Sequence, residues 1–399
     1  QNIEKPGREL ERDARANVIQ RYLDQINTIL GRNDKVKPNE LNRHFIQKPL
    51  LPYFIINDLT IEEFANLTEQ IPVESPIQIY SSSTRDYPYG SALSHTLGYV
   101  VTSKDIPEEN LPGDEFRTFN TKGSYGKDGL EFQYDASLQG KTGSEIWIVD
   151  PGGFQVERVQ NEPPQKGQDI VTSVDIDLQI AGEDAYGDRR GALVALDVET
   201  GEILAIVSKP DYDLNQLTPF ISHKVFNQIS EDGAWINRAV QGLYPPGSPF
   251  KLITGLAGLR SGSITEETTS FCTGYFKLGR SNKPCWNHSG HGELDVREAI
   301  RLSCNVFFYE HSLETGPNLI AAEARLFGLD QPTGIELPFE TSRMIVPDPK
   351  WKKERLNISW VGGDTTNMAI GQGFLQVTPL QMACFAASLA RGETRTTPT

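Results

Sequence analysis

The sequence predicts an α+β fold in which strands come before helices in the second half of the chain. Two apolar runs, residues 191–197 and 202–208, flank a Val-Glu-Thr-Gly turn at 198–201, which is a strong hairpin signal. Helical periodicity of apolar residues then dominates to about residue 390. Strands followed by helices are typical of a domain in which helices pack on the faces of an antiparallel sheet.

The chain before this hairpin has a different composition. An amphipathic pattern predicts a helix over residues 8–31, and residues 72–170 are rich in Gly, Pro, Ser and Asp. A linker-like segment at 160–167 marks the change, and residues 169–174 form a β-prone run that predicts a strand. We therefore expect one domain over residues 1–165 and a second over residues 166–399.

The overall charge excludes several classes of partner. The chain of 399 residues has 53 acidic and 38 basic side chains and a net charge of −15, which argues against nucleic acid and against a polybasic membrane patch. No run of about 18 apolar residues is present, so no segment is predicted to span a bilayer. The chain opens without a signal-peptide pattern, which predicts either a cytosolic protein or a leader or anchor that precedes this sequence.

A serine and a lysine stand at the start of a predicted helix. Residues 244–247, Tyr-Pro-Pro-Gly, break any preceding element, and Pro249 suits the first helical position, where a missing N–H costs nothing. Lys251 follows Ser248 by one turn, so the two side chains share a face. A lysine with a lowered pKa can accept the serine proton and create a nucleophile. The alternative is a capped helix with a solvated lysine, because S-x-x-K alone is a weak signal.

A second motif, Ser303-Cys304-Asn305, lies 55 residues after Ser248. A hydroxyl and an amide two residues apart point the same way in an extended loop. There they can relay a proton and hold a substrate carbonyl. The pattern S-x-N is almost uninformative about function by itself, so it supports a catalytic role only together with the first motif.

Together the two motifs resemble those of the penicillin-binding proteins and serine β-lactamases, which combine S-x-x-K, S-x-N or S-D-N, and K-T-G. The flanking segments look like those of the monofunctional, class B penicillin-binding proteins: residues 237–248, 191–215, 363–373 and 377–383 in the predicted transpeptidase domain, and residues 87–90, 95–100 and 126–131 in the predicted pedestal. The resemblance covers roughly residues 85–395. Within class B the chain is most similar to the penicillin-binding protein 2 branch, which belongs to the cell-elongation machinery.

This resemblance implies a penicillin-binding transpeptidase domain, an antiparallel sheet with helices on its faces, together with an extended non-catalytic pedestal. It also implies a serine-type D-Ala-D-Ala transpeptidase that needs no cofactor for its chemistry. Ser248 would attack the penultimate D-Ala carbonyl of a stem peptide, with Lys251 as base. Ser303 or Lys251 would protonate the leaving D-Ala, Asn305 would hold the substrate amide, and the Ser248 N–H would contribute to the oxyanion hole. β-Lactam antibiotics would acylate Ser248.

The third family motif, K-T-G, should follow Gln372 by several tens of residues, and we expect it beyond Thr399. Residues 141–143 spell Lys-Thr-Gly, but they lie far before Ser248 in the predicted pedestal, where the match is expected to be a coincidence. The motif supplies a cation for the substrate carboxylate and an oxyanion N–H. A chain that lacked it should be slow or inactive.

Four residues suggest a metal site, since Cys272, Cys285, His291 and Cys304 form the pattern Cys-x12-Cys-x5-His-x12-Cys. Three thiolates and an imidazole are a normal structural zinc shell. The spacing is longer than in tight zinc motifs, and a Cys272–Cys285 disulfide or free buried thiols remain alternatives. His288 is the other candidate ligand, although the resemblance centres on His291. Cys304 lies inside the second motif, so a bound zinc would brace it.

The resemblance also implies a location and partners. We expect the periplasmic face of the bacterial inner membrane, with an anchoring helix outside this sequence. The expected partners are peptidoglycan stem peptides, β-lactams, a membrane glycosyltransferase and other elongation-complex proteins.

Two other functions fit the same motifs. One is a β-lactamase or β-lactam sensor on the same fold, which the pedestal and the Tyr-Pro-Pro-Gly context argue against. The other is a non-catalytic scaffold of the elongation complex.

Overall fold

The structure is a computed structural model. It describes residues 7–47, 53–56, 59–72, 75–79, 85–103, 123–140, 144–149, 155–163, 165–218 and 221–399. The Lys-Thr-Gly sequence at 141–143 lies outside these described residues.

Packing divides the chain into two compact units. The first comprises residues 1–85, 102–124 and 136–168, and the second comprises residues 86–101, 125–135 and 169–399. This division is discontinuous in sequence, whereas the domain boundary at 165/166 is a single cut, and that boundary stays a prediction.

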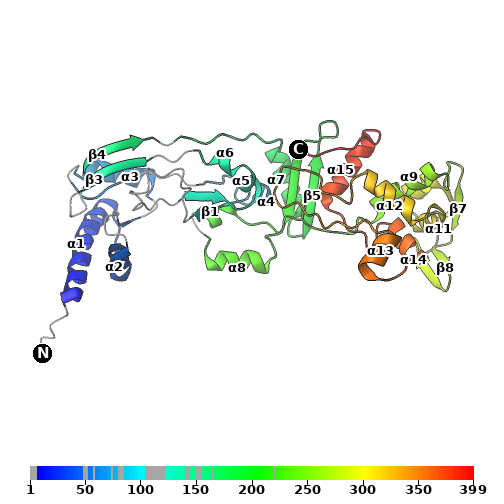
Figure 1. The fold of residues 1–399 in the computed structure, drawn as a ribbon, viewed down its shortest axis with the longest axis horizontal. Helices are drawn as coiled ribbons and strands as arrows, with labels where there is room; N and C mark the ends of the chain where they lie inside the picture. The colour runs from blue at the N-terminus through cyan, green and yellow to red at the C-terminus, as the bar shows by residue number, and fades with distance from the viewer. Residues whose placement is uncertain are drawn as a thin grey trace, which may run out of the picture. The chain divides into compact units, whose positions relative to one another are not determined.

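The first unit contains a helical group and a long hairpin (Figure 1). Its elements are α1 (Gly7–Leu30), α2 (Pro38–Gln47), α3 (Ile61–Gln70), α6 (Asp135–Leu138), β3 (Ser144–Val149) and β4 (Gln155–Glu162). Helix α3 begins at a capping box, in which the Thr60 side chain accepts from the Glu63 N–H and the Glu63 carboxylate accepts from the Thr60 N–H. Strands β3 and β4 pair antiparallel.

The remaining elements mix helices and strands, as expected for an α+β fold, but four of the strands lie within residues 269–295, in the region predicted to be mainly helical. Two short strands, β1 (Val100–Ser103) and β2 (Gly123–Gly126), pair with each other. The second unit then contains α4 (Ser94–Leu97), α5 (Gly129–Gln133), α7 (Ile176–Tyr186), β5 (Gly191–Leu196), β6 (Ile203–Lys209), η3 (Leu214–Leu217), α8 (His223–Glu231), η4 (Ser248–Phe250), α9 (Lys251–Ser261), β7 (Thr269–Cys272), β8 (Tyr275–Leu278), β9 (Ser281–Pro284), β10 (Gly292–Asp295), α10 (Val296–Arg301), α11 (Asn305–Thr315), α12 (Pro317–Leu326), α13 (Pro349–Leu356), α14 (Gly362–Ala369) and α15 (Pro379–Ala390).

The predicted hairpin is present as β5 and β6, which pair antiparallel with Val194 opposite Ile206. Because side chains alternate along a strand, the hairpin presents two apolar faces. Val194 and Ile206 join the core cluster that contains Leu380 of α15, while Gly182 of α7 lies close to Val207. Helices therefore cover both faces of the hairpin, and α7 and α15 lie on its two sides in Figure 1.

The candidate site lies in the helical part of the second unit. Helix α9 packs on α11 and α12. Phe250, the last residue of η4, and Ile253 in the first turn of α9 belong to the main core. Helix α11 contributes Phe307 and Phe308 to a second buried cluster. These apolar side chains are fully buried and fix the start of α9 beside the start of α11.

The strand predicted over residues 169–174 is wrong. These residues lie in irregular structure, and the Val171 side chain is 95% exposed. The Asp175 side chain instead accepts from the N–H groups of Asp177 and Leu178 and starts α7. Among the described residues, every helix is too short or too polar to cross a bilayer.

Candidate active site

Backbone hydrogen bonds join the loop before Ser248 to the segment after α14. Tyr244 and Val377 exchange backbone hydrogen bonds of 2.9 and 3.0 Å, and the Gly247 N–H donates to the Gly371 carbonyl at 2.9 Å. Gly247 has φ of +65° and ψ of −147°, a backbone conformation that is essentially restricted to glycine. This turn delivers Ser248 to the first position of the η4 turn that leads into α9.

Lys251 is buried and donates three hydrogen bonds from its ammonium group. Its Nζ lies 2.7 Å from the Ser303 carbonyl, 2.9 Å from Ser303 Oγ and 2.6 Å from Asn305 Oδ1. Burial lowers the pKa of Lys251 to about 8, and negative charge on the nearby Cys285 and Cys304 sulfurs acts in the opposite direction. Near neutral pH, a useful fraction of this lysine is therefore neutral and able to accept a proton.

Ser303 connects the lysine to the first serine. Its hydroxyl donates to Ser248 Oγ at 3.0 Å while it accepts from Lys251. The sequence predicted a direct approach of Lys251 to Ser248, but in the structure the connection runs through Ser303. A hydroxyl can both donate and accept, so the order can reverse once Lys251 is neutral. The arrangement can then pass a proton from Ser248 through Ser303 to Lys251.

Asn305 completes the group of four predicted residues. It is the first residue of α11, and its Nδ2 donates a long hydrogen bond of 3.4 Å to the Pro284 carbonyl. Its Oδ1 accepts a hydrogen bond from Lys251 Nζ, which fixes the orientation of the amide group. The weakly engaged Nδ2 is the group that a substrate carbonyl could capture.

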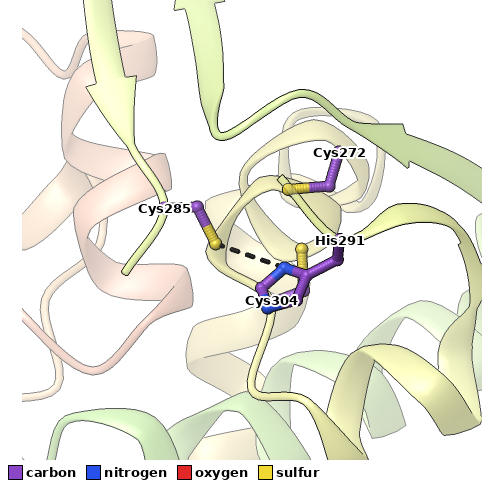
Figure 2. Close-up of side chains that lie close together, drawn as sticks. All are labelled: Cys272, Cys285, His291 and Cys304. Carbon is purple, nitrogen blue, oxygen red and sulfur yellow. Dashed lines mark hydrogen bonds between the residues drawn. The ribbon is translucent and has the colours of Figure 1, made fainter. Parts of the chain in front are cut away.

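The second constellation brings together Cys272, Cys285, His291 and Cys304, as the sequence predicted (Figure 2). Their ligand atoms all lie within 4.8 Å of one another. Pairing of β7 with β10 and the His291 N–H bond to the Cys272 carbonyl, 3.1 Å long, place these two residues side by side. Cys285 follows β9, and Cys304 directly precedes α11. Among the described residues the cluster includes His291 and not His288.

The cysteines of this cluster are free thiols, so the Cys272–Cys285 disulfide is not formed in this structure. Burial acts to raise the pKa of Cys285, but hydrogen bonds from the Asn287, Asn305 and Val306 N–H groups outweigh it and lower that pKa. Burial raises the pKa of Cys304 to about 12. The pKa of Cys285 is therefore lower than that of Cys304. The fourth cysteine, Cys384, lies outside this cluster and is buried on α15.

The distances in the cluster fit a tetrahedral cation. Zinc bonds of about 2.3 Å to sulfur and 2.0 Å to nitrogen imply a sulfur–nitrogen edge of about 3.6 Å. Cys285 Sγ lies 3.6 Å from His291 Nδ1. His291 Nε2 is buried and has no hydrogen-bond partner among the described residues.

Sequence reasoning missed Lys283 and Trp286, and it placed Gly371 only within the family-like segment 363–373. Lys283 donates to Asn367 Oδ1 at 2.6 Å and so ties β9 to α14. Trp286 donates from Nε1 to the Leu302 carbonyl at 2.9 Å, next to Ser303. The Gly371 carbonyl accepts from the Gly247 N–H, and the only feature of the sequence that indicated this residue is its place in a Gly-Gln-Gly segment. The other two depend on tertiary contacts that no local pattern encodes.

Comparisons with known proteins cover both halves of the chain. A sequence model of the family described as "Penicillin binding protein transpeptidase domain" matches residues 191–399. A second, described as "Penicillin-binding Protein dimerisation domain", matches residues 7–172.

Curated relatives include proteins named peptidoglycan D,D-transpeptidase MrdA. The one from Acinetobacter baumannii is 34% identical over 347 residues, which cover 86% of this chain and 51% of the relative. The one from Escherichia coli K12 is 36% identical over 313 residues, which cover 77% and 49%. The chain thus spans about half the length of the curated relatives it matches.

Solved structures agree in fold. The penicillin-binding protein PBP2 from Helicobacter pylori, in complex with MreC, has a TM-score of 0.77 and 28% identity, covering 99% of this chain and 72% of that chain. Pseudomonas aeruginosa PBP2 in complex with WCK 5153 has a TM-score of 0.65 and 32% identity, covering 78% and 66%.

Proposed function

The chain belongs to the penicillin-binding proteins that carry a transpeptidase domain, and we propose that it is the catalytic and pedestal part of a peptidoglycan D,D-transpeptidase of cell elongation. The observation that carries this proposal is the line of hydrogen bonds from Ser248 through Ser303 to Lys251. Ser248 is the nucleophile, Ser303 is the proton relay and buried Lys251 is the base, and they are hydrogen-bonded in the order that acyl transfer requires.

Acylation begins when Ser248 Oγ attacks the carbonyl carbon of the penultimate D-Ala of a stem peptide. The serine proton passes through Ser303 to neutral Lys251, and the Ser248 N–H stabilises the developing oxyanion. The peptide C–N bond then breaks, and the terminal D-Ala leaves with the proton returned along the same relay. This step yields an ester on Ser248 and a base that is neutral again, ready to accept a proton in the next half-reaction.

Deacylation repeats the sequence with a different nucleophile. An amine from a neighbouring strand attacks the ester carbonyl and gives its proton to the relay. The relay passes this proton to Ser248 Oγ as the ester C–O bond breaks, which releases the cross-link and restores the serine. Asn305 Nδ2 would hold the amide of the donor peptide, since its bond to Pro284 is long and readily replaced. The chemistry moves protons and an acyl group only, so no cofactor takes part.

The direct test uses the complete gene product with a donor pentapeptide and an acceptor amine. We expect release of D-Ala and a cross-linked product, and the loss of both in Ser248→Ala. A wild-type protein that releases no D-Ala while it is folded would favour the scaffold alternative.

Deacylation speed separates a transpeptidase from a β-lactamase or sensor. We expect the penicilloyl ester on Ser248 to persist for minutes or longer in the complete protein. Rapid hydrolysis with multiple turnovers of penicillin would point to a β-lactamase.

The location and partners follow from the same proposal. The H. pylori relative forms a complex with MreC, and another similar structure is described as a peptidoglycan synthase complex. We propose that this chain works at the periplasmic face of the inner membrane with elongation-complex proteins and a membrane glycosyltransferase. The P. aeruginosa relative is described in complex with WCK 5153, and we propose that β-lactams acylate Ser248 in this chain.

We also propose that Cys272, Cys285, His291 and Cys304 bind a structural zinc ion. Cys304 separates Ser303 from Asn305, so an ion bound to it would hold both ends of the second motif. The ion would supply no catalytic step.

Zinc binding predicts one equivalent of metal in the purified complete protein. His291→Ala should lower the zinc content and the melting temperature, because it removes one of four ligands from a shared site. The control is His288→Ala, a neighbouring imidazole outside the cluster, which should leave both unchanged. Protein without zinc, in which Cys272 and Cys285 are oxidised to a disulfide, would contradict this proposal.

A further inference from the structure

The backbone at Ser303 has an uncommon conformation. Its φ is +50°, in the left-handed region that residues with a Cβ seldom occupy. The conformation matters because it sets where Ser303 Oγ lies, between Ser248 and Lys251. A residue in this region persists only when its surroundings hold both adjoining peptide groups.

The two peptide groups on either side of Ser303 are both hydrogen-bonded through their N–H and through their carbonyl oxygen. In the group between Leu302 and Ser303, the N–H donates to Ile300 at 3.0 Å and the carbonyl accepts from Trp286 Nε1 at 2.9 Å. In the next group, the Cys304 N–H donates to Ala299 at 2.9 Å and the Ser303 carbonyl accepts from Lys251 at 2.7 Å. Three of these four bonds come from the local helix or from the relay itself.

The fourth bond comes from a side chain that has little other structural role. The Trp286 side chain is 62% exposed, so it contributes less burial than a core tryptophan would. Its ring contacts the edge of His291, with ring centroids 5.3 Å apart. The indole N–H of Trp286 donates to the Leu302 carbonyl, and the orientation of this carbonyl is coupled to φ of Ser303.

We propose that Trp286 is a positioning residue for Ser303. Its N–H holds the Leu302–Ser303 peptide group so that Ser303 Oγ stays in contact with both Ser248 and Lys251. Without this bond the Leu302 carbonyl can rotate, Ser303 can leave the left-handed region, and the proton relay breaks. This inference rests on the proposed function, since it assigns a role within that relay.

The test compares acylation of Ser248 by a fluorescent penicillin in the complete wild-type protein and in Trp286→Phe. Phenylalanine keeps an aromatic ring but removes the N–H. We expect the first-order acylation rate constant to fall about tenfold, as loss of one hydrogen bond in the reacting arrangement allows. The dissociation constant of the noncovalent penicillin complex should change less than about twofold.

The matched control is Trp235→Phe. Trp235 also donates from its indole N–H, to Ser230 Oγ at 2.9 Å, but it lies in a separate aromatic cluster of the second unit. This variant should acylate at the wild-type rate. A drop in both variants would show a general effect of losing a tryptophan and would overturn the proposal.

The other outcomes are equally decisive. Wild-type protein that is not labelled at Ser248 contradicts the proposed function itself. Normal labelling of wild type with an unchanged rate constant in Trp286→Phe overturns the positioning role alone. If Trp286→Phe fails to fold, 3-benzothienylalanine placed at position 286 keeps the bicyclic shape and replaces the N–H by sulfur. The same tenfold loss is then expected, and a wild-type rate would refute the role.

Discussion

Lys251→Met is expected to lower the rate constant for acylation of Ser248 by about a thousandfold, in the range that general bases contribute. Methionine is similar in length to lysine and fills the buried site, but it has no basic group. A lower rate constant therefore reports the loss of the proton acceptor. Stopped-flow measurement with a fluorescent penicillin gives the rate constant. The control is Lys277→Met, which removes an exposed lysine from β8 and should have no effect. Acylation of Lys251→Met within tenfold of wild type would exclude this lysine as the base.

The pH dependence follows from the same residue. Since burial lowers the Lys251 pKa to about 8, the rate constant should rise with pH through about 8 and level off above it. The sign is set by the reaction, because only the neutral amine accepts the serine proton. Below the pKa the rate constant should fall about tenfold per pH unit. An unshifted lysine would place this rise near pH 10.4 instead.

Gly371→Ala is expected to disable the site and destabilise the second unit. A Cβ at Gly371 would lie 2.1 Å from the Gly247 carbonyl oxygen and 2.6 Å from its nitrogen, and Gly371 has φ of +71°. Backbone atoms cannot give way as a flexible side chain can, so the Gly247 turn must move and take Ser248 with it. We expect a loss of about 2 kcal/mol or more in unfolding free energy and little labelling by penicillin.

Gly363→Ala is the matched control for this substitution. Gly363 lies in α14, and the nearest atom to an added Cβ, of the Val361 side chain, is 3.9 Å away. Alanine favours helix, so this variant should be as stable as wild type or slightly more so. Denaturant unfolding of both variants checks the pair. Equal stability and labelling for Gly371→Ala and Gly363→Ala would contradict the packing described for the Gly247 turn.

Local patterns predicted those parts of the fold that local interactions determine. The β5–β6 hairpin was predicted because its turn and its apolar runs are adjacent in sequence. Residues 169–174 have the same β-prone composition but no partner strand among the described residues, so the strand prediction was wrong there. Composition describes what a segment can form, whereas pairing depends on what lies beside it.

The candidate site shows the same limit. Residue types and motif order were sufficient to select Ser248, Lys251, Ser303 and Asn305, and the structure brings them together. Which hydroxyl stands between lysine and serine could not be predicted, because it depends on a 3.0 Å contact across 55 residues of chain. Trp286 could not be found for the same reason: its only signal is a hydrogen bond to the Leu302 carbonyl.

The residue that a penicillin acylates tests the proposed nucleophile most directly. The complete protein should be incubated with a penicillin, digested and analysed by mass spectrometry. We predict one penicilloyl group per chain, on the peptide that contains Ser248, and none in Ser248→Ala. A penicilloyl group on another residue, or a folded protein that acquires none, would contradict the central claim that Ser248 is the nucleophile of this transpeptidase.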